Sequence, residues 1–179
     1  MCFTTPEDNR EVDDMTRTSM TGASAVTPVP DVADALVDQQ QIFPYLTYAD
    51  APAAIDWLCR VFGFELANSY TVADSRIAHA ALCHEGLYVM LSSEMAQLRN
   101  CAPDSEARAT SRVHIHVRDV EAHYQRALLE GATIVQGLQD HFWGLRSYHA
   151  LDSEGYRWSF CQRVREVPRE VVERQLLAW

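Results

Sequence analysis

The sequence contains no lysine. All fifteen basic residues are arginine, and they face 25 acidic residues, which leaves a net charge of −10. The absence of lysine excludes any activity that depends on a lysine Schiff base or a lysine general base. The acidic balance and the lack of a basic run argue against a nucleic-acid surface. We therefore expect no nucleic-acid partner.

Long apolar runs and paired cysteines are also missing. No apolar stretch approaches the ~20 residues that are needed to cross a bilayer. The N-terminus lacks the basic-then-apolar pattern of a secretory signal. The cysteines are odd in number and show no metal-type spacing, which favours reduced thiols; they are Cys2, Cys59, Cys83, Cys101 and Cys161. We expect a soluble, cytoplasmic protein with no membrane partner.

Residues 1–40 are predicted to form a poorly ordered acidic leader. They hold eight acidic residues against Arg10 and Arg17, with Ser, Thr and Pro between them. Such a composition offers little burial to offset the entropy of ordering. The polar stretch 94–111 is typical of a linker. Apolar residues at helical spacing predict an amphipathic C-terminal helix within 163–179.

Residues 41–93 and 112–162 follow one plan. Each begins with a short strand and an aspartate suited to capping a helix, Asp50 or Asp119. A helix follows, then a glycine suited to a left-handed C-cap, and then three strand-like segments. The pattern predicts a βαβββ module that occurs twice, and hence an α+β fold with a mostly antiparallel sheet.

Four segments carry a family resemblance: "YLTYADAPAAIDWLCRVFGFEL", "RIAHAALCHEGLYVML", "VHIHVRDVEAHYQRALLEGA" and "HFWGLRSYHALDSEGYRWSFC". In this order they resemble the vicinal oxygen chelate superfamily, the glyoxalase and bleomycin-resistance group, over about residues 42–162. The resemblance implies that the two modules pair into one cup-shaped sheet with the helices outside. It also implies a small organic ligand in the cup, a homodimer, and a role such as antibiotic resistance.

Metal-dependent members of this family hold a divalent ion through the first and last strands of each module. Carried over by spacing from the capping aspartates and the final turn, these positions fall on Phe43, Met90, Arg112 and Ser159. None of these side chains suits a hard or borderline divalent ion. We therefore expect no metal at these positions and no cofactor.

Strand alternation predicts which side chains line the cup. The aliphatic Val113 and Ile115 should face a helix, so that Arg112, His114 and His116 face the cup. The same alternation in the other strands, together with loop 141–148 near the cup mouth of the resembling group, gives the predicted ligand-binding set. It contains Phe43, Tyr45, Thr47, Tyr88, Met90, Arg112, His114, His116, Trp143, Arg146, Tyr148 and Ser159. Cys161 should also face inward, and Trp143, Arg146 and Tyr148 are expected to clamp a planar or anionic ligand.

Three functions fit these observations. The leading hypothesis is a metal-independent protein that sequesters an aromatic or amphiphilic molecule without catalysis. The rival is an enzyme of the same fold, a lyase, isomerase or dioxygenase. It would use a histidine acid–base pair or a metal relocated to His114 and His116. Further ligands would come from His79, His149, Glu85 or Cys161. A third possibility is an accessory dimer that acts through its leader or tail.

Overall fold

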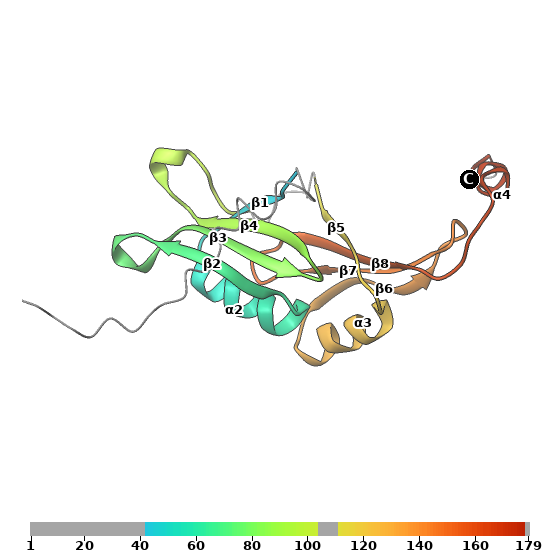
Figure 1. The fold of residues 1–179 in the computed structure, drawn as a ribbon, viewed down its shortest axis with the longest axis horizontal. Coiled ribbons are helices and arrows are strands. Elements are labelled where there is room, and N and C mark those ends of the chain that lie inside the picture. Colours follow the sequence, from blue (N-terminus) through green and yellow to red (C-terminus); the bar gives the residue numbers. More distant parts are fainter. Residues whose placement is uncertain (1–41, 104–110, 178–179) are drawn as a thin grey trace, which may run out of the picture. The chain divides into compact units, whose positions relative to one another are not determined.

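One helix and four strands make up each half of the folded chain. The computed structural model describes residues 42–103 and 111–177 (Figure 1), all within the compact unit Asp31–Trp179. The predicted acidic leader, 1–40, lies outside the described residues. No helix of the described ranges is both long enough and apolar enough to pass through a bilayer.

The first half is a βαβββ module. It consists of β1 (Tyr45–Tyr48), α2 (Ala51–Phe62), β2 (Glu65–Thr71), β3 (Ile77–His84) and β4 (Leu87–Ser93). The strand order is β1-β4-β3-β2, with β1 parallel to β4 and the other pairs antiparallel. A short 3-10 turn, Ala73–Ser75, joins β2 to β3.

The second half repeats this plan. Its elements are β5 (Val113–His116), α3 (Val120–Leu129), β6 (Thr133–Asp140), β7 (Leu145–Leu151) and β8 (Arg157–Arg163). The order is β5-β8-β7-β6, again with one parallel pair. The α+β class and the doubled βαβββ plan are thus confirmed. Within the described ranges the strands form two four-stranded sheets.

Both long helices begin at the predicted capping residues. The Asp50 carboxylate accepts a hydrogen bond from the Ala53 N–H, and the Asp119 carboxylate accepts from the N–H groups of Glu121 and Ala122. These bonds satisfy donors that the first turn of a helix leaves unpaired. Helix α2 ends at Gly63, whose φ of 74° is the left-handed conformation that glycine adopts without strain.

A shared aromatic core joins the two modules. Phe62 at the end of α2 packs on Trp158 and Phe160 of β8, with ring centroids 5.6 and 4.8 Å apart. All three side chains are fully buried, and burial of each contributes on the order of 2 kcal/mol or more. Since Trp158 and Phe160 face the helices as predicted, alternation turns Ser159 and Cys161 to the opposite face.

Parts of the segments outside the two modules lie within the described residues. Within the predicted linker 94–111, a 3-10 turn (Ala96–Leu98) is followed by Asn100, whose side-chain amide donates to the hydroxyls of Thr47 and Ser92. Residues 104–110 lie outside the described ranges. The predicted C-terminal segment contains α4 (Arg169–Leu176), none of whose residues is buried.

Candidate functional site

The sheet face that points away from α3 carries a group of polar side chains, which we call the polar face. His114 on β5 lies opposite Ser159 on β8, which in turn lies opposite His149 on β7. One step further, His116 lies opposite Cys161, which lies opposite Ser147. Together with two arginines, the polar face consists of Arg112, His114, His116, Ser147, His149, Arg157, Ser159 and Cys161.

The His114 ring is held by two partners on β8. Its Nδ1 lies 3.0 Å from the Ser159 hydroxyl oxygen, and its Nε2 lies 3.2 Å from the Cys161 sulfur. Burial, then the neighbouring His116 and Arg112, lower the pKa of His114, so the ring is neutral at pH 7. Burial raises the pKa of the Cys161 thiol to about 11. A neutral imidazole therefore faces a protonated thiol.

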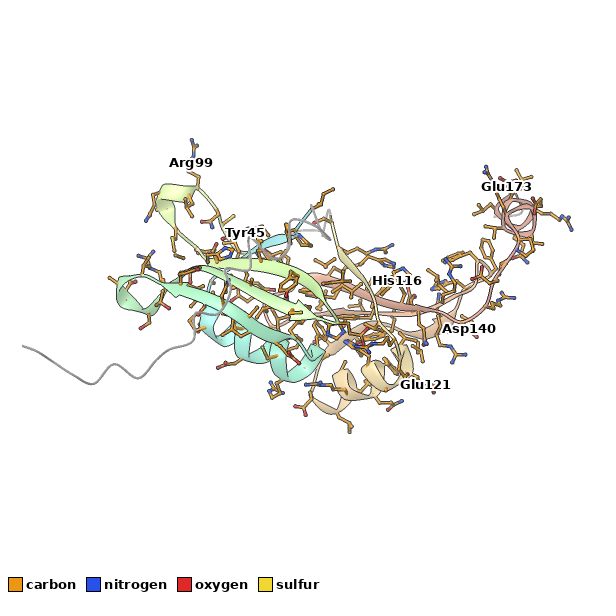
Figure 2. All side chains as sticks on the ribbon, in the orientation of Figure 1. Tyr45, Arg99, His116, Glu121, Asp140 and Glu173 are labelled. Carbon is orange, nitrogen blue, oxygen red and sulfur yellow. The ribbon has the colours of Figure 1, made fainter. Side chains whose placement is uncertain are left out.

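His116 completes a cluster of three potential metal ligands. Its ring meets that of His114 edge to face, with centroids 5.5 Å apart, and it lies opposite Cys161 in the strand register. One donor atom from each of His114, His116 and Cys161 lies within 4.8 Å of the others. Imidazole nitrogen and thiolate sulfur are ligands of zinc and of the later first-row transition metals. Figure 2 labels His116 on β5.

A groove separates β1 from the start of β5. Its volume is about 340 Å³, at the small end of the range for ligand pockets. Tyr45 on β1, half exposed, is on one side, and its hydroxyl oxygen lies 3.1 Å from His79 Nδ1. The whole lining consists of Pro44, Tyr45, Leu46, Ser111, Arg112, Val113, His114, Tyr156 and Arg157.

Arg112 and Arg157 give the groove a positive charge. Both side chains are exposed, and neither has an acidic partner among residues 42–103 and 111–177. By contrast, Arg118, two residues beyond β5, pairs with Glu85 at 3.1 Å. Two unpaired guanidinium groups in an acidic protein are available to hold the anionic or polar end of a ligand.

The predicted residues of the first sheet divide into two groups. Phe43 and Tyr88 pack around Ala81 and are half buried, and Met90 lies beside Tyr45 in the register. Thr47, in contrast, is 9% exposed and receives the Asn100 amide. The structure thus places Phe43, Tyr45, Tyr88 and Met90 on one partly accessible face and Thr47 beneath Asn100.

Arg146 and Tyr148 lie outside the polar face, which corrects the expected clamp. Both point to the α3 side of β7. Tyr148 is fully buried, with its hydroxyl oxygen 2.6 Å from His123 Nδ1. Arg146 pairs with Asp140 and Glu121, both labelled in Figure 2. The physical reason is strand parity, because Ser147 and His149 alternate with these two residues and point the other way.

Trp143 lies at the far end of the polar face, in the turn before β7. Its ring stacks on His141 with centroids 4.3 Å apart, and His141 Nε2 lies 2.7 Å from the Ser147 hydroxyl. Sequence reasoning missed this His141–Ser147 pair. It turned Arg157 inward by alternation along β8 but left it out of the ligand-binding set. Strand alternation could have placed Ser147 and His149, with Leu145, on one face of β7.

The residues at the family's four metal positions do not fit a metal ion. Arg112 brings a fixed positive charge, and the Ser159 hydroxyl is engaged by His114 Nδ1. Phe43 packs against Ala81, and Met90 offers a thioether that is too soft for the hard and borderline divalent ions. These four side chains therefore do not form a coordination site.

Comparison with known proteins places this geometry in a family. The model of the Glyoxalase/Bleomycin resistance protein/Dioxygenase superfamily matches residues 39–160. An uncharacterised protein from Mycobacterium tuberculosis is 35% identical over 133 residues, which are 73% of this chain and 78% of that protein.

Solved structures agree. TioX from Micromonospora sp. ML1 is 35% identical, with a TM-score of 0.56, over 72% of this chain and 100% of that one. A superfamily member from Sphaerobacter thermophilus is 15% identical and shares the fold, with a TM-score of 0.51 over 69% of this chain and 98% of that one. From the matched residues and the doubled βαβββ fold, we conclude that the chain belongs to the glyoxalase, bleomycin-resistance protein and dioxygenase superfamily.

Proposed function

We propose that the protein sequesters a small aromatic or amphiphilic molecule in the groove between β1 and β5, without catalysis and without an ion at the family's metal positions. One observation carries this proposal. Arg112 stands at one of those positions, lines the groove, and has no acidic partner among the described residues. A guanidinium group there supplies the positive charge that an ion supplies in metal-dependent relatives, but it cannot offer an open coordination position.

The groove contains both kinds of contact that such a ligand needs. The half-exposed Tyr45 ring provides an apolar surface for stacking, worth about 0.5–1.5 kcal/mol beyond the area that it buries. Arg112 and Arg157 provide planar, charged donors for a carboxylate, sulfonate or phenolate. An anionic aromatic molecule uses both at once.

We further propose that the protein acts in the cytoplasm as a homodimer. The four cysteines of the described residues, Cys59, Cys83, Cys101 and Cys161, are free thiols, which suits a reducing compartment. Large side chains on β2, Leu66 and Tyr70, are about half exposed and offer apolar area for a partner copy. Analytical ultracentrifugation tests the dimer directly.

Titration with 1-anilinonaphthalene-8-sulfonate, an anionic aromatic fluorophore, tests the binding proposal. Chelator-treated full-length protein should bind it saturably and release it unchanged. Arg112→Ala should weaken binding about 10-fold or more, because a charge-assisted hydrogen bond contributes about 1.5–3 kcal/mol. Arg118→Ala is the matched control, since Arg118 pairs with Glu85 outside the groove. Equal affinities for the two variants, or no binding after chelation, would contradict the proposal.

One observation favours the rival function, an enzyme with a relocated metal. The cluster of His114, His116 and Cys161 is the only such group found in residues 42–103 and 111–177.

A further inference from the structure

We propose that His114, His116 and Cys161 bind a zinc ion, at a site displaced along β5 and β8 from the position that the family uses. The proposal goes beyond the sequestering function, which requires no ion. It rests on strand register, interatomic distances and the chemistry of the three donors.

The strand register brings the three side chains to one face. His114 and His116 are two apart on β5, so their side chains point the same way. Cys161 lies directly opposite His116 on the parallel strand β8. Two residues on one strand and one on its neighbour can supply three of the ligands of one metal ion. The regular backbone pairing of β5 with β8, and not a loop, fixes their positions.

The proposed site keeps the offset between its ligand positions on β5 and β8. The ligand positions of metal-dependent relatives, carried over by spacing, correspond to Arg112 and Ser159 in this module. Two residues further along each strand stand His114 and Cys161, the next side chains on the same face. Because both donors move by the same step, the offset between the two ligand positions is unchanged. The site has shifted along the sheet as a unit.

The distances suit one ion between the donors. Zinc bonds of about 2.0–2.1 Å to nitrogen and 2.3 Å to sulfur put two such atoms about 3.5 Å apart at a tetrahedral angle. His114 Nε2 and Cys161 Sγ are 3.2 Å apart. The widest separation in the cluster is no more than 4.8 Å, which a small rotation of the exposed His116 ring can close.

Ser159 orients the first ligand. Its hydroxyl oxygen lies 3.0 Å from His114 Nδ1, so the ring can donate there and present an unprotonated Nε2 to the ion. A hydrogen bond of this kind on the second ring nitrogen is the usual support of a zinc-bound histidine. Ser159 is a positioning residue, because it touches the ring and not the ion.

Charged groups near the cluster act on zinc binding in opposite directions. Arg112 on β5 and Arg157 on β8 are cationic, and they oppose a dication. The Cys161 thiol must lose its proton to bind, and the resulting thiolate offsets one of the two zinc charges. The site has three protein ligands and therefore leaves the fourth position open, as in catalytic rather than structural zinc sites. Because His114 also lines the groove, the open coordination position is near the proposed organic ligand.

Zinc titration of chelator-treated, full-length protein tests the proposal, with cobalt as a spectroscopic probe. We expect a single ion per chain and, with cobalt, an intense thiolate-to-metal absorption band. Cys161→Ser and His116→Ala should each weaken zinc binding more than about 100-fold, a loss above that caused by removing a supporting hydrogen bond. Ser159→Ala should weaken it about 10-fold and keep the band.

Matched controls separate this site from other donors and from the groove. Cys101→Ser and His141→Ala remove residues of the same types outside the cluster and should leave zinc affinity unchanged. Arg112→Ala should retain zinc while it binds the fluorophore about 10-fold or more weakly. Cys161→Ser should bind the fluorophore normally while it loses zinc affinity, so that the two proposals are tested by separate measurements. Substoichiometric zinc, a cobalt spectrum without the thiolate band, or equal affinity for Cys161→Ser and Cys101→Ser would overturn the zinc site.

Discussion

The imidazole rings of His84 and His123 meet edge to face in the core between the two modules, with centroids 5.4 Å apart and planes at 87°. His123 is further held by the Phe62 carbonyl oxygen, 3.0 Å from its Nε2, and by the Tyr148 hydroxyl at Nδ1. Burial, then the neighbouring His84, lower the pKa of His123 to about 4. The junction of the modules is therefore built around a neutral histidine.

Acid should loosen this junction. An unfolded chain takes up a proton on His123 near pH 6.5, whereas the folded protein resists until about pH 4. The free energy of unfolding therefore decreases as the pH falls between these values, by up to roughly 3 kcal/mol from this group. Urea unfolding between pH 7.5 and 4.5 measures the slope. His123→Gln should flatten it, whereas His79→Gln, at a half-exposed site on β3, should not; equal slopes in both variants would disprove the assignment.

Removing the carboxylate of Asp152 should destabilise the fold strongly. Its Oδ2 accepts from the Tyr48 hydroxyl at 2.7 Å and from the Trp158 indole N–H at 2.9 Å, and all three residues are buried. Asp152→Ala leaves two buried donors unpaired, at a cost of about 3 kcal/mol or more. Glu173→Ala, at an exposed ion pair with Arg169 in α4, should cost less than about 1 kcal/mol. Urea denaturation compares the two, and similar losses would refute the importance of this network.

Ligand affinity in the groove should depend on the charge of His114. Since its pKa is lowered, the ring is neutral at pH 7 and becomes charged only on acidification. In chelator-treated protein, binding of 1-anilinonaphthalene-8-sulfonate should therefore strengthen on acidification, at a pH below that at which a free histidine takes up its proton. N-phenyl-1-naphthylamine, its uncharged analogue, should show no such increase. Parallel pH profiles for the two fluorophores, or an unchanged profile in His114→Gln, would exclude the ring from the site.

Tyr148→Phe should affect stability and leave binding unchanged. The substitution removes the hydroxyl partner of His123 Nδ1 on the α3 side of β7, which should cost about 1–3 kcal/mol. Fluorophore affinity should match that of the unmodified protein, because the ring is fully buried away from the groove. A large loss of affinity at unchanged stability would return Tyr148 to the binding set.

The sequence was sufficient to predict the helices and strands of both modules because the signals for them are local. Asp50, Asp119 and Gly63 mark helix ends through their own backbone preferences, and the aliphatic run of Val113 and Ile115 identifies the buried side of β5. Family resemblance then supplied the arrangement of the modules, which local signals do not contain.

The site was harder to predict because it depends on register. Arg146 and Tyr148 were expected at the ligand, yet a difference of one residue in parity turns a side chain to the other face of its strand. The contact of His114 with Cys161 depends on how β5 pairs with β8, which lie 40 or more residues apart in the chain. Neither the parity of β7 nor the pairing of β5 with β8 is determined by the local sequence pattern.

The Asn100 amide makes the two halves of the repeat unequal. The aspartate spacing that relates the modules matches Thr47 with His116 and Ser92 with Cys161. In the first module the Asn100 nitrogen bridges the two hydroxyls, 3.2 Å from each. The first copy thus has an amide between its two hydroxyls, whereas the second has the exposed His116 ring beside the buried Cys161 thiol. The duplication has therefore kept the same fold in both modules, while the equivalent positions have come to carry different chemistry.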